Sequence, residues 1–417
     1  MTSCGVDVDG NGGSNVDSTM AAVAPVAPTS SVLVWARLES GYDPERVAKR
    51  LGVKPERVTE WEAGDLVPTM RQLESLAKFY HRPLGIFFRP KPPVVAPLAS
   101  EYRRLPGVTP GHESPELRLA VRKMSNRREM MVELLEELGE TIPVFGLAAH
   151  LDEKPETVAG RLRLALNLPV DSQLGWASEW EAWASWRAAV EDLGVLVFQF
   201  PKVALEEARG VSLLRWPLPV AGVNSKEMSP EARSFTLMHE VVHLMLAAGH
   251  EELPAAKESR RGADWQVLER FAEEAASHVL VPERALALMV SAMNITTEGW
   301  DLASVRKLAR KFRITPLAMA TRLRASGYFD WAFYRHWKQE WDAHVARLKP
   351  RGGGFSTPVG KTLGRAGQPF TRLVLEAMSA NRITSDQAAR HLDLKFEHFG
   401  KLKDALRARP GTGGADE

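Results

Sequence analysis

Residues 235–246 read Phe-Thr-Leu-Met-His-Glu-Val-Val-His-Leu-Met-Leu, an apolar run that contains one His-Glu-x-x-His pattern. Such a run predicts a helix buried in the protein core. Four residues span little more than one helical turn, so His239 and His243 project from one face and can bind a single metal ion together. Glu240 lies about 100° further round the helix, where it would stand beside the ion as a general base. The alternative is a pair of buried histidines that hydrogen-bond to the backbone.

A catalytic zinc site needs a third protein ligand and leaves its fourth position open for water. The next expected helix, residues 264–280, carries Glu269 between apolar neighbours and follows His243 at a distance that lets the chain turn back across the first helix. We therefore expect Glu269 to be the third ligand, with Glu273 or His278 as the alternatives. Glu273 follows one turn later on the same face, where its carboxylate could orient a ligating histidine. The competing interpretation is that these glutamates form a solvated helix face.

The two segments that carry these residues resemble a known family, the ImmA/IrrE metallopeptidases. The resemblance rests on Ala-Arg-Ser-Phe-Thr-Leu-Met-His-Glu-Val-Val-His-Leu at 232–244 and on Leu-Glu-Arg-Phe-Ala at 268–272. It extends over positions 170–345. The family usually has Asn or Asp where this chain has Glu273, and Glu where it has His278.

The resemblance implies a zincin-like domain with Zn²⁺ as its cofactor. The ligands would be His239, His243 and Glu269, and Glu240 would be the catalytic base. Several family members cleave a partner transcriptional repressor. The implied activity is thus a zinc metallo-endopeptidase that cuts a helix-turn-helix repressor or antitoxin-like protein in a stress, mobile-element or defence response. The alternative is a DNA-binding transcriptional regulator whose zinc domain senses a signal or dimerises without proteolysis. DNA and a second copy of this chain are further candidate partners.

The composition is that of a globular protein. Of the 417 residues, 44% are hydrophobic and 25% are charged, which suffices for two or three cores. The one cysteine, Cys4, excludes an intramolecular disulfide and is typical of a reducing cytoplasm. No apolar run approaches the ~20 residues of a membrane span. The first thirty residues contain no Lys or Arg, which argues against a signal peptide. We expect a cytoplasmic protein with no membrane partner.

Residues 31–90 have the pattern of a small helical domain. Helices are expected at 44–51, 55–63 and 70–80, with a tight turn at Gly52. This pattern resembles an XRE-type helix-turn-helix, in which the helix after the turn enters the major groove of DNA. The expected DNA-contacting residues are Lys54, Arg57 and Thr59. The same helix carries three glutamates, which would repel phosphates unless they face away, so docking of a protein partner is the alternative.

The whole chain is expected to adopt an α+β fold that is mostly helical. It would comprise an N-terminal helix-turn-helix bundle, a zincin-like metallopeptidase domain with a small β-sheet, and a helical C-terminal extension. The sheet would offer an edge to which an extended peptide could add as a strand. The expected segments are a disordered tail at 1–30, the helix-turn-helix domain at 31–90, a linker and helical connector at 91–169, the peptidase domain at 170–345, and a Gly-rich linker and helical region at 346–417.

Three further patterns have no function that the sequence alone assigns. Residues 301–351 carry twelve Lys and Arg against four Asp and Glu, which indicates a solvated helical surface or, alternatively, a site for an acidic substrate or nucleic acid. Residues 377–406 predict a second short helix pair. Tryptophans recur at intervals of four and three residues, which predicts a packed interface helix or a binding platform; they are Trp176, Trp180, Trp183 and Trp186.

Overall fold

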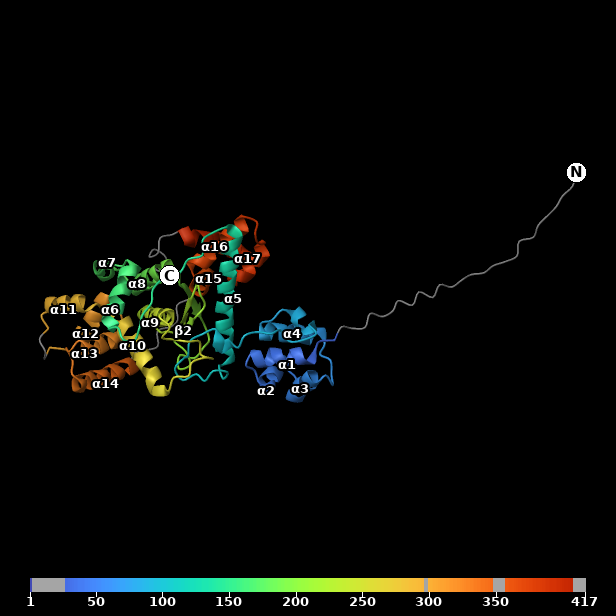
Figure 1. Cartoon of the computed structure of the whole chain (residues 1–417), viewed down its shortest axis with the longest axis horizontal. Helices are drawn as coiled ribbons and strands as arrows, with labels where there is room; N and C mark the ends of the chain where they lie inside the picture. Colours follow the sequence, from blue (N-terminus) through green and yellow to red (C-terminus); the bar gives the residue numbers. More distant parts are fainter. Residues whose placement is uncertain (2–26, 296–298, 348–356, 408–417) are drawn as a thin grey trace. The chain divides into compact units, whose positions relative to one another are not determined.

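The computed structural model describes Met1 and residues 27–295, 299–347 and 357–407. The disordered tail expected at 1–30 and the Gly-rich linker expected after 346 fall mostly on residues outside this description. The described chain forms two compact units, Met1–Pro93 and Val94–Glu417 (Figure 1). The predicted α+β fold with mostly helical content is confirmed. The finer division into five segments stays a prediction.

The first unit is a small helical bundle in which α2, α3 and α4 have the predicted bounds. Asp43 begins α2 by accepting a hydrogen bond from the backbone N–H of Arg46 at 2.6 Å. Gly52 then turns the chain toward α3 with a φ of 70°, a left-handed conformation that glycine adopts without strain. The elements are α1 (Ser30–Glu39), α2 (Pro44–Leu51), α3 (Pro55–Ala63), α4 (Met70–Tyr80) and the 3₁₀ helix η1 (Leu84–Phe88).

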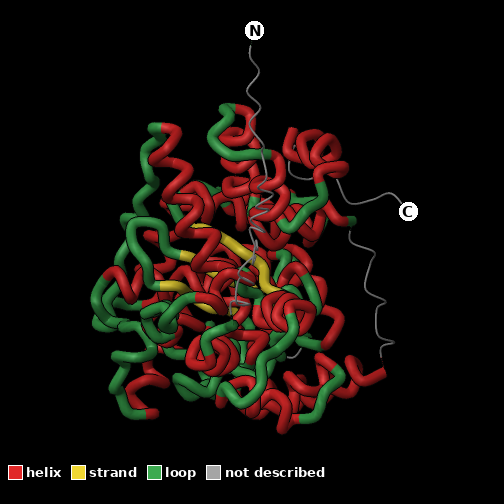
Figure 2. The backbone as a smooth tube through the Cα atoms, turned by 90° about the vertical axis from the view of Figure 1, so that its right-hand side faces the viewer, coloured by secondary structure: helices red, strands yellow, loops and turns green. Residues whose placement is uncertain are grey.

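The second unit is built around a mixed sheet with the strand order β1-β3-β2 in the described residues. The strands are β1 (Leu196–Phe200), β2 (Gly210–Leu213) and β3 (Val220–Asn224). β3 runs parallel to β1 and antiparallel to β2. Every strand residue is buried, as expected of a sheet that helices cover on both faces. Figure 2 shows the strands enclosed by helices.

The outer edge of β2 is already paired with the segment that follows the first unit. The backbone N–H of Arg103 donates to the carbonyl of Ser212 at 3.1 Å, and that of Leu214 donates to Glu101 at 3.1 Å. On its other side the segment is paired in turn, because Ala255 donates to the carbonyl of Tyr102 at 2.8 Å. The expectation of a free edge for a substrate peptide is therefore wrong at β2, since residues 101–103 fill that place.

Two hydrophobic cores lie on the two faces of the sheet. Successive side chains of a strand point to opposite faces, so Val197 joins one core while Leu196 and Phe198 join the other. The first core contains α9 (Pro230–Ala248), which packs against β2, β3, α8 (Glu179–Asp192) and α10 (Gly262–Leu280). Because α9 is buried against this face of the sheet, its polar side chains can lie close to the edge strand β2.

The remaining helices complete these two cores. Among the described residues, none of the helices has the length and apolar character that a membrane span requires. Their bounds are α5 (Pro115–Leu138), α6 (Pro155–Leu166), α7 (Val170–Gly175), α11 (Glu283–Ala292), α12 (Leu302–Phe312), α13 (Pro316–Ala325), α14 (Trp331–Arg347), α15 (Pro358–Ala366), α16 (Gln368–Ser379), α17 (Ser385–Leu392) and α18 (Phe399–Arg407), with 3₁₀ helices η2 (Leu98–Ser100) and η3 (Phe396–His398).

The tryptophan stripe belongs mostly to the core. Trp183 and Trp186 on α8 are buried, and Trp176, which precedes α8, packs edge-on against Trp186 with 5.4 Å between ring centroids. Trp180 alone of the four is exposed, and the guanidinium of Arg233 lies over its ring. Three of the four tryptophans therefore pack within the core of the second unit, and not at an interface between the two units.

Candidate metal centre and active site

The histidines and Glu240 are positioned by α9. Ser229 begins this helix, because its hydroxyl accepts a hydrogen bond from the backbone N–H of Ala232 at 3.2 Å. Pro230 occupies the first turn, where its missing N–H costs nothing. The helix is buried over most of its length, as its apolar sequence predicts. The side chains of His239 and His243 therefore project from one face of a helix that is packed in the core.

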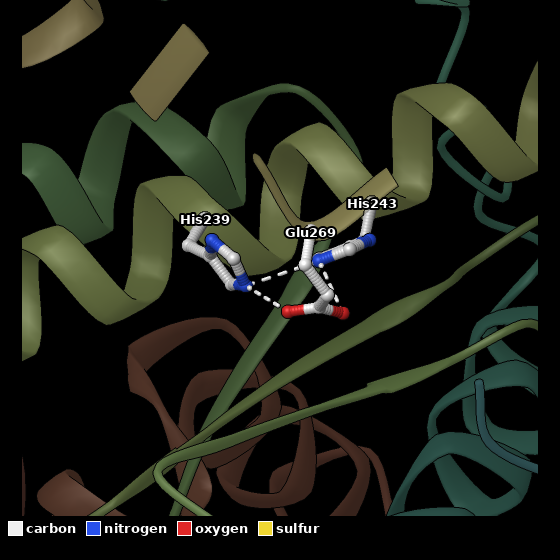
Figure 3. A group of neighbouring side chains, drawn as sticks. All are labelled: His239, His243 and Glu269. Carbon is white, nitrogen blue, oxygen red and sulfur yellow. Dashed lines mark hydrogen bonds and ion pairs between the residues drawn. The ribbon is translucent and has the colours of Figure 1, made fainter. Parts of the chain in front are cut away.

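Three side chains meet on this face: His239, His243 and Glu269 of α10 (Figure 3). The two Nε2 atoms lie 3.0 Å apart. The carboxylate oxygens of Glu269 lie 3.4 Å from His239 Nε2 and 3.5 Å from His243 Nε2. A tetrahedral zinc ion with bonds of ~2.0–2.1 Å holds its ligand atoms roughly 3.3 Å apart. The spacing of the three groups thus fits one ion at their centre.

The surroundings of the histidines also fit a metal. His239 Nδ1 is buried without a hydrogen-bond partner among the described residues. His243 is fully buried, and burial lowers its pKa well below the ordinary value, so the ring is neutral and keeps a lone pair. In the described part of the chain neither ring bonds to the backbone. The interpretation as backbone-satisfied core histidines is therefore not supported.

Glu252 makes the contact with a metal-binding histidine that was expected of Glu273. It lies in the loop after α9, fully buried, and its Oε2 is 2.8 Å from His243 Nδ1. Burial raises the pKa of Glu252 to about 8. Glu273 is instead exposed on α10. One helical turn carries it about 5–6 Å along the axis beyond Glu269, and it does not belong to the group formed by His239, His243 and Glu269. The sequence could not indicate this exchange, because it depends on the path of the loop after α9.

The other alternative ligand, His278, is engaged elsewhere. Arg322 of α13 lies 2.9 Å from His278 Nδ1 and 3.2 Å from its Nε2, and also pairs with Glu283 at 2.8 Å. Burial and the charge of Arg322 lower the pKa of His278. This histidine therefore helps to dock α13 on α10 and lies outside the group formed by His239, His243 and Glu269.

Arg103 is the principal site residue that sequence reasoning missed. Its side chain is 2% exposed and reaches both Glu240 and Glu269, from which it is 137 and 166 residues distant in sequence. Nη2 lies 3.1 Å from Glu240 Oε1 and Nη1 lies 2.9 Å from Glu269 Oε1. Burial alone would lower the pKa of Arg103, but the two carboxylates hold it above its ordinary value. No local pattern marks this arginine.

Glu240 is fixed by groups from two other parts of the chain. Ser212 of β2 donates its hydroxyl hydrogen to Oε2 at 2.6 Å, and Arg103 approaches both carboxylate oxygens. A Cβ on Gly210 would lie 2.4 Å from Oε1, so only glycine leaves room for the carboxylate. Burial would raise the pKa of Glu240, but the charge and hydrogen bond of Arg103, together with the charges of His239 and His243, lower it. The side chain is therefore held as a carboxylate.

The expected DNA-contacting residues lie exposed on the first unit. Arg57 pairs with Glu60 at 3.7 Å, and the Thr59 hydroxyl donates to the carbonyl of Glu56 at 2.8 Å. Lys54 precedes α3 and is also exposed. Glu62, one of the three glutamates of α3, is turned inward and forms an ion pair with Arg37 at 2.7 Å. This inward pairing removes one of the charges that would repel phosphate.

Comparison with known protein families gives one match for the region of the metal centre and another for the first unit. Residues 190–324 match the family model of the IrrE N-terminal-like domain, a metallopeptidase family, and this span includes the two histidines, Glu240 and Glu269. This segment is similar to the IrrE N-terminal-like domain. Residues 33–87 match a helix-turn-helix family model. The predicted resemblance to the ImmA/IrrE family, with a helix-turn-helix in front, is thereby confirmed. No curated protein matches the chain.

Proposed function

We propose that this protein is a zinc-dependent endopeptidase that cleaves a partner helix-turn-helix repressor or antitoxin-like protein and so regulates gene expression. One observation carries the proposal: ligand atoms of His239, His243 and Glu269 lie within 4.8 Å of one another, and Arg103 links Glu269 to the buried carboxylate of Glu240. The IrrE-like domain supports the peptidase assignment, and the helix-turn-helix domain supports a role at genes.

The residues divide into metal ligands and a base. His239, His243 and Glu269 would hold Zn²⁺, and Glu252 would orient His243 through its Nδ1. When bound, the ion lowers the pKa of a water molecule and polarises the scissile carbonyl. Glu240 would take the proton of the attacking water and return it to the leaving amine. The lowered pKa of Glu240 keeps it as a carboxylate, which is the protonation state that a general base needs.

Arg103 and Ser212 are positioning residues in this scheme. They hold the Glu240 carboxylate through three hydrogen bonds, which fix its orientation. Preorganised groups of this kind reduce the reorganisation that the reaction would otherwise require. Because Arg103 follows the first unit in the chain, the linker contributes directly to the site.

We expect about one zinc ion per chain, which metal analysis of purified protein will measure. Replacing His239 or His243 by Ala should abolish retention, and Glu269→Ala should weaken it strongly, because two neutral nitrogens alone bind the ion poorly. Glu252→Gln should weaken affinity about 10–100-fold through loss of the support for His243. Glu273→Gln is the matched control on α10 and should retain zinc fully. Full occupancy in Glu269→Ala would reject Glu269 as a ligand.

The substrate class can be tested directly. Zinc-loaded protein is incubated with purified helix-turn-helix repressors that are encoded beside its gene, and the products are identified by mass spectrometry. We expect one of them to be cut at a single site, and we expect a chelator to stop the cleavage and added zinc to restore it. Cleavage that continues unchanged after chelation would contradict a metal-dependent mechanism.

DNA is a second candidate partner that one feature of the first unit favours. Between α2 and α4 lies a hollow of about 530 Å³, and Arg50, Arg71 and Lys78 line it with no acidic residue among them. Such a surface suits the phosphates of a nucleic acid. This supports a regulator that holds DNA while the second unit acts on its protein substrate.

A further inference from the structure

The C-terminal helix pair repeats the pattern of the N-terminal helix-turn-helix. Position 384 corresponds to position 43, an offset of 341 residues that holds throughout the comparison. Asp43 and Thr384 each begin an eight-residue helix by accepting a hydrogen bond from the backbone N–H three residues later. The residues after these helices, Gly52 and Asp393, both adopt left-handed backbone conformations with φ of 70° and 51°.

The buried positions also coincide at this offset. In the first module Val47, Val58 and Trp61 form part of its core. In the second the corresponding residues are Ala388, Phe399 and Leu402, and they are buried as well. One difference lies after the turn: the place of Pro55 is taken by Phe396, and the chain makes the 3₁₀ turn η3 before α18 begins. The two helix pairs thus share their helix cap, turn and core pattern.

We propose that residues 384–407 form a second helix-turn-helix module and that α18 binds the phosphates of duplex DNA. This segment lies outside both regions that match known families, 33–87 and 190–324. The proposal is independent of the peptidase function, because it concerns a different surface and needs no metal.

Charge distinguishes the two recognition helices. α3 of the first module carries one Arg against three Glu, a net charge of −2. α18 carries two Lys and one Arg against one Asp, a net charge of +2. Affinity for DNA rests largely on neutralised phosphates. Of the two helices, α18 is therefore the better suited to bind a duplex.

The basic side chains of α18 are exposed to solvent and free to contact phosphates. Lys401, Lys403 and Arg407 form no ion pair with any residue that the structure describes. Asp386 of α17 is occupied by another cation, because it pairs with Arg390 at 2.7 Å. Asp393 likewise pairs with a cation, Arg365 of α15, at 3.4 Å.

α18 is held so that its charged side faces outward. Phe399 and Leu402 insert into the core shared with α5, α16 and α17, and these helices lie together in Figure 1. Arg372 of α16 donates a hydrogen bond to the carbonyl of Leu406 at 3.3 Å and closes the end of the helix. The module is thus fixed on the second unit and presents α18 without needing to rearrange.

The test uses the full-length protein and a fluorescein-labelled duplex of mixed sequence. Anisotropy is measured at low salt and over a salt series. Lys401→Glu together with Lys403→Glu should weaken binding at least about tenfold and reduce the slope of log K against log salt by about 2, one unit for each lost phosphate contact. Lys401→Gln with Lys403→Gln should lower the slope equally, which separates lost contacts from added repulsion.

Lys54→Glu with Arg57→Glu is the matched pair on the first module and should change binding less than the α18 pair. All four positions are exposed, so thermal unfolding should match that of the parent protein. The proposal is overturned if the parent protein does not bind the duplex at low salt. It is also overturned if the α18 variants bind within about twofold of the parent with an unchanged salt slope.

Discussion

Replacing Glu240 by Gln is expected to reduce cleavage of the protein substrate by about 10²–10⁴-fold, while zinc content stays at the level of the parent protein. Gln has nearly the size and shape of Glu, but it cannot take a proton from water. No ligand atom is removed, since the three grouped side chains are His239, His243 and Glu269. Rates measured with saturating zinc and a purified target will give the reduction.

The same variant should also lose stability. Glu240 is fully buried and accepts hydrogen bonds from Arg103 and Ser212. An amide offers one oxygen where the carboxylate offers two, so one buried donor loses its acceptor, at a cost of about 1–3 kcal/mol. Glu273→Gln is the matched control, because it makes the same chemical change at an exposed position on α10 and should leave both stability and cleavage unaltered.

Biological output measured with Glu240→Gln separates the two functional interpretations. A peptidase that acts by cutting a repressor loses its regulation together with its cleavage. A DNA-binding regulator without proteolysis keeps regulation when Glu240 is replaced. Unimpaired cleavage by this variant would exclude Glu240 as the base.

The sequence predicted the elements whose signals are local. α2, α3 and α4 have the expected bounds because a capping Asp43, a left-handed Gly52 and apolar spacing are all read within a few residues. The grouping of His239 with His243 follows from helical periodicity. Glu269 could be inferred because the helix that carries it is the next one along the chain.

Contacts made across long stretches of sequence could not be predicted in this way. Arg103 and Ser212 reach Glu240 from a linker and a strand, and their contacts depend on how the linker pairs with the edge of β2. Glu252 replaced Glu273 for a similar reason, since the loop after α9 turns back against His243. Such contacts are properties of tertiary packing, which no spacing rule within one segment contains.

Arg103→Ala is expected to lower the free energy of unfolding of the zinc-free protein by about 3–5 kcal/mol, the range typical of removing one partner from a buried ion pair. The change leaves the carboxylates of Glu240 and Glu269 close together and without the guanidinium that contacts both. Denaturant unfolding followed by circular dichroism in the presence of a chelator will measure the loss.

Zinc should offset part of this loss, because an ion held by Glu269 and the histidines restores positive charge beside the two carboxylates. The stabilisation that zinc confers should therefore be larger in Arg103→Ala than in the parent protein. Arg103→Lys is the control, because lysine keeps the charge but lacks the planar guanidinium that contacts both carboxylates. The stability of this variant should lie between that of Arg103→Ala and that of the parent protein. If Arg103→Ala unfolds at the same denaturant concentration as the parent protein without zinc, Arg103 does not hold these carboxylates in solution.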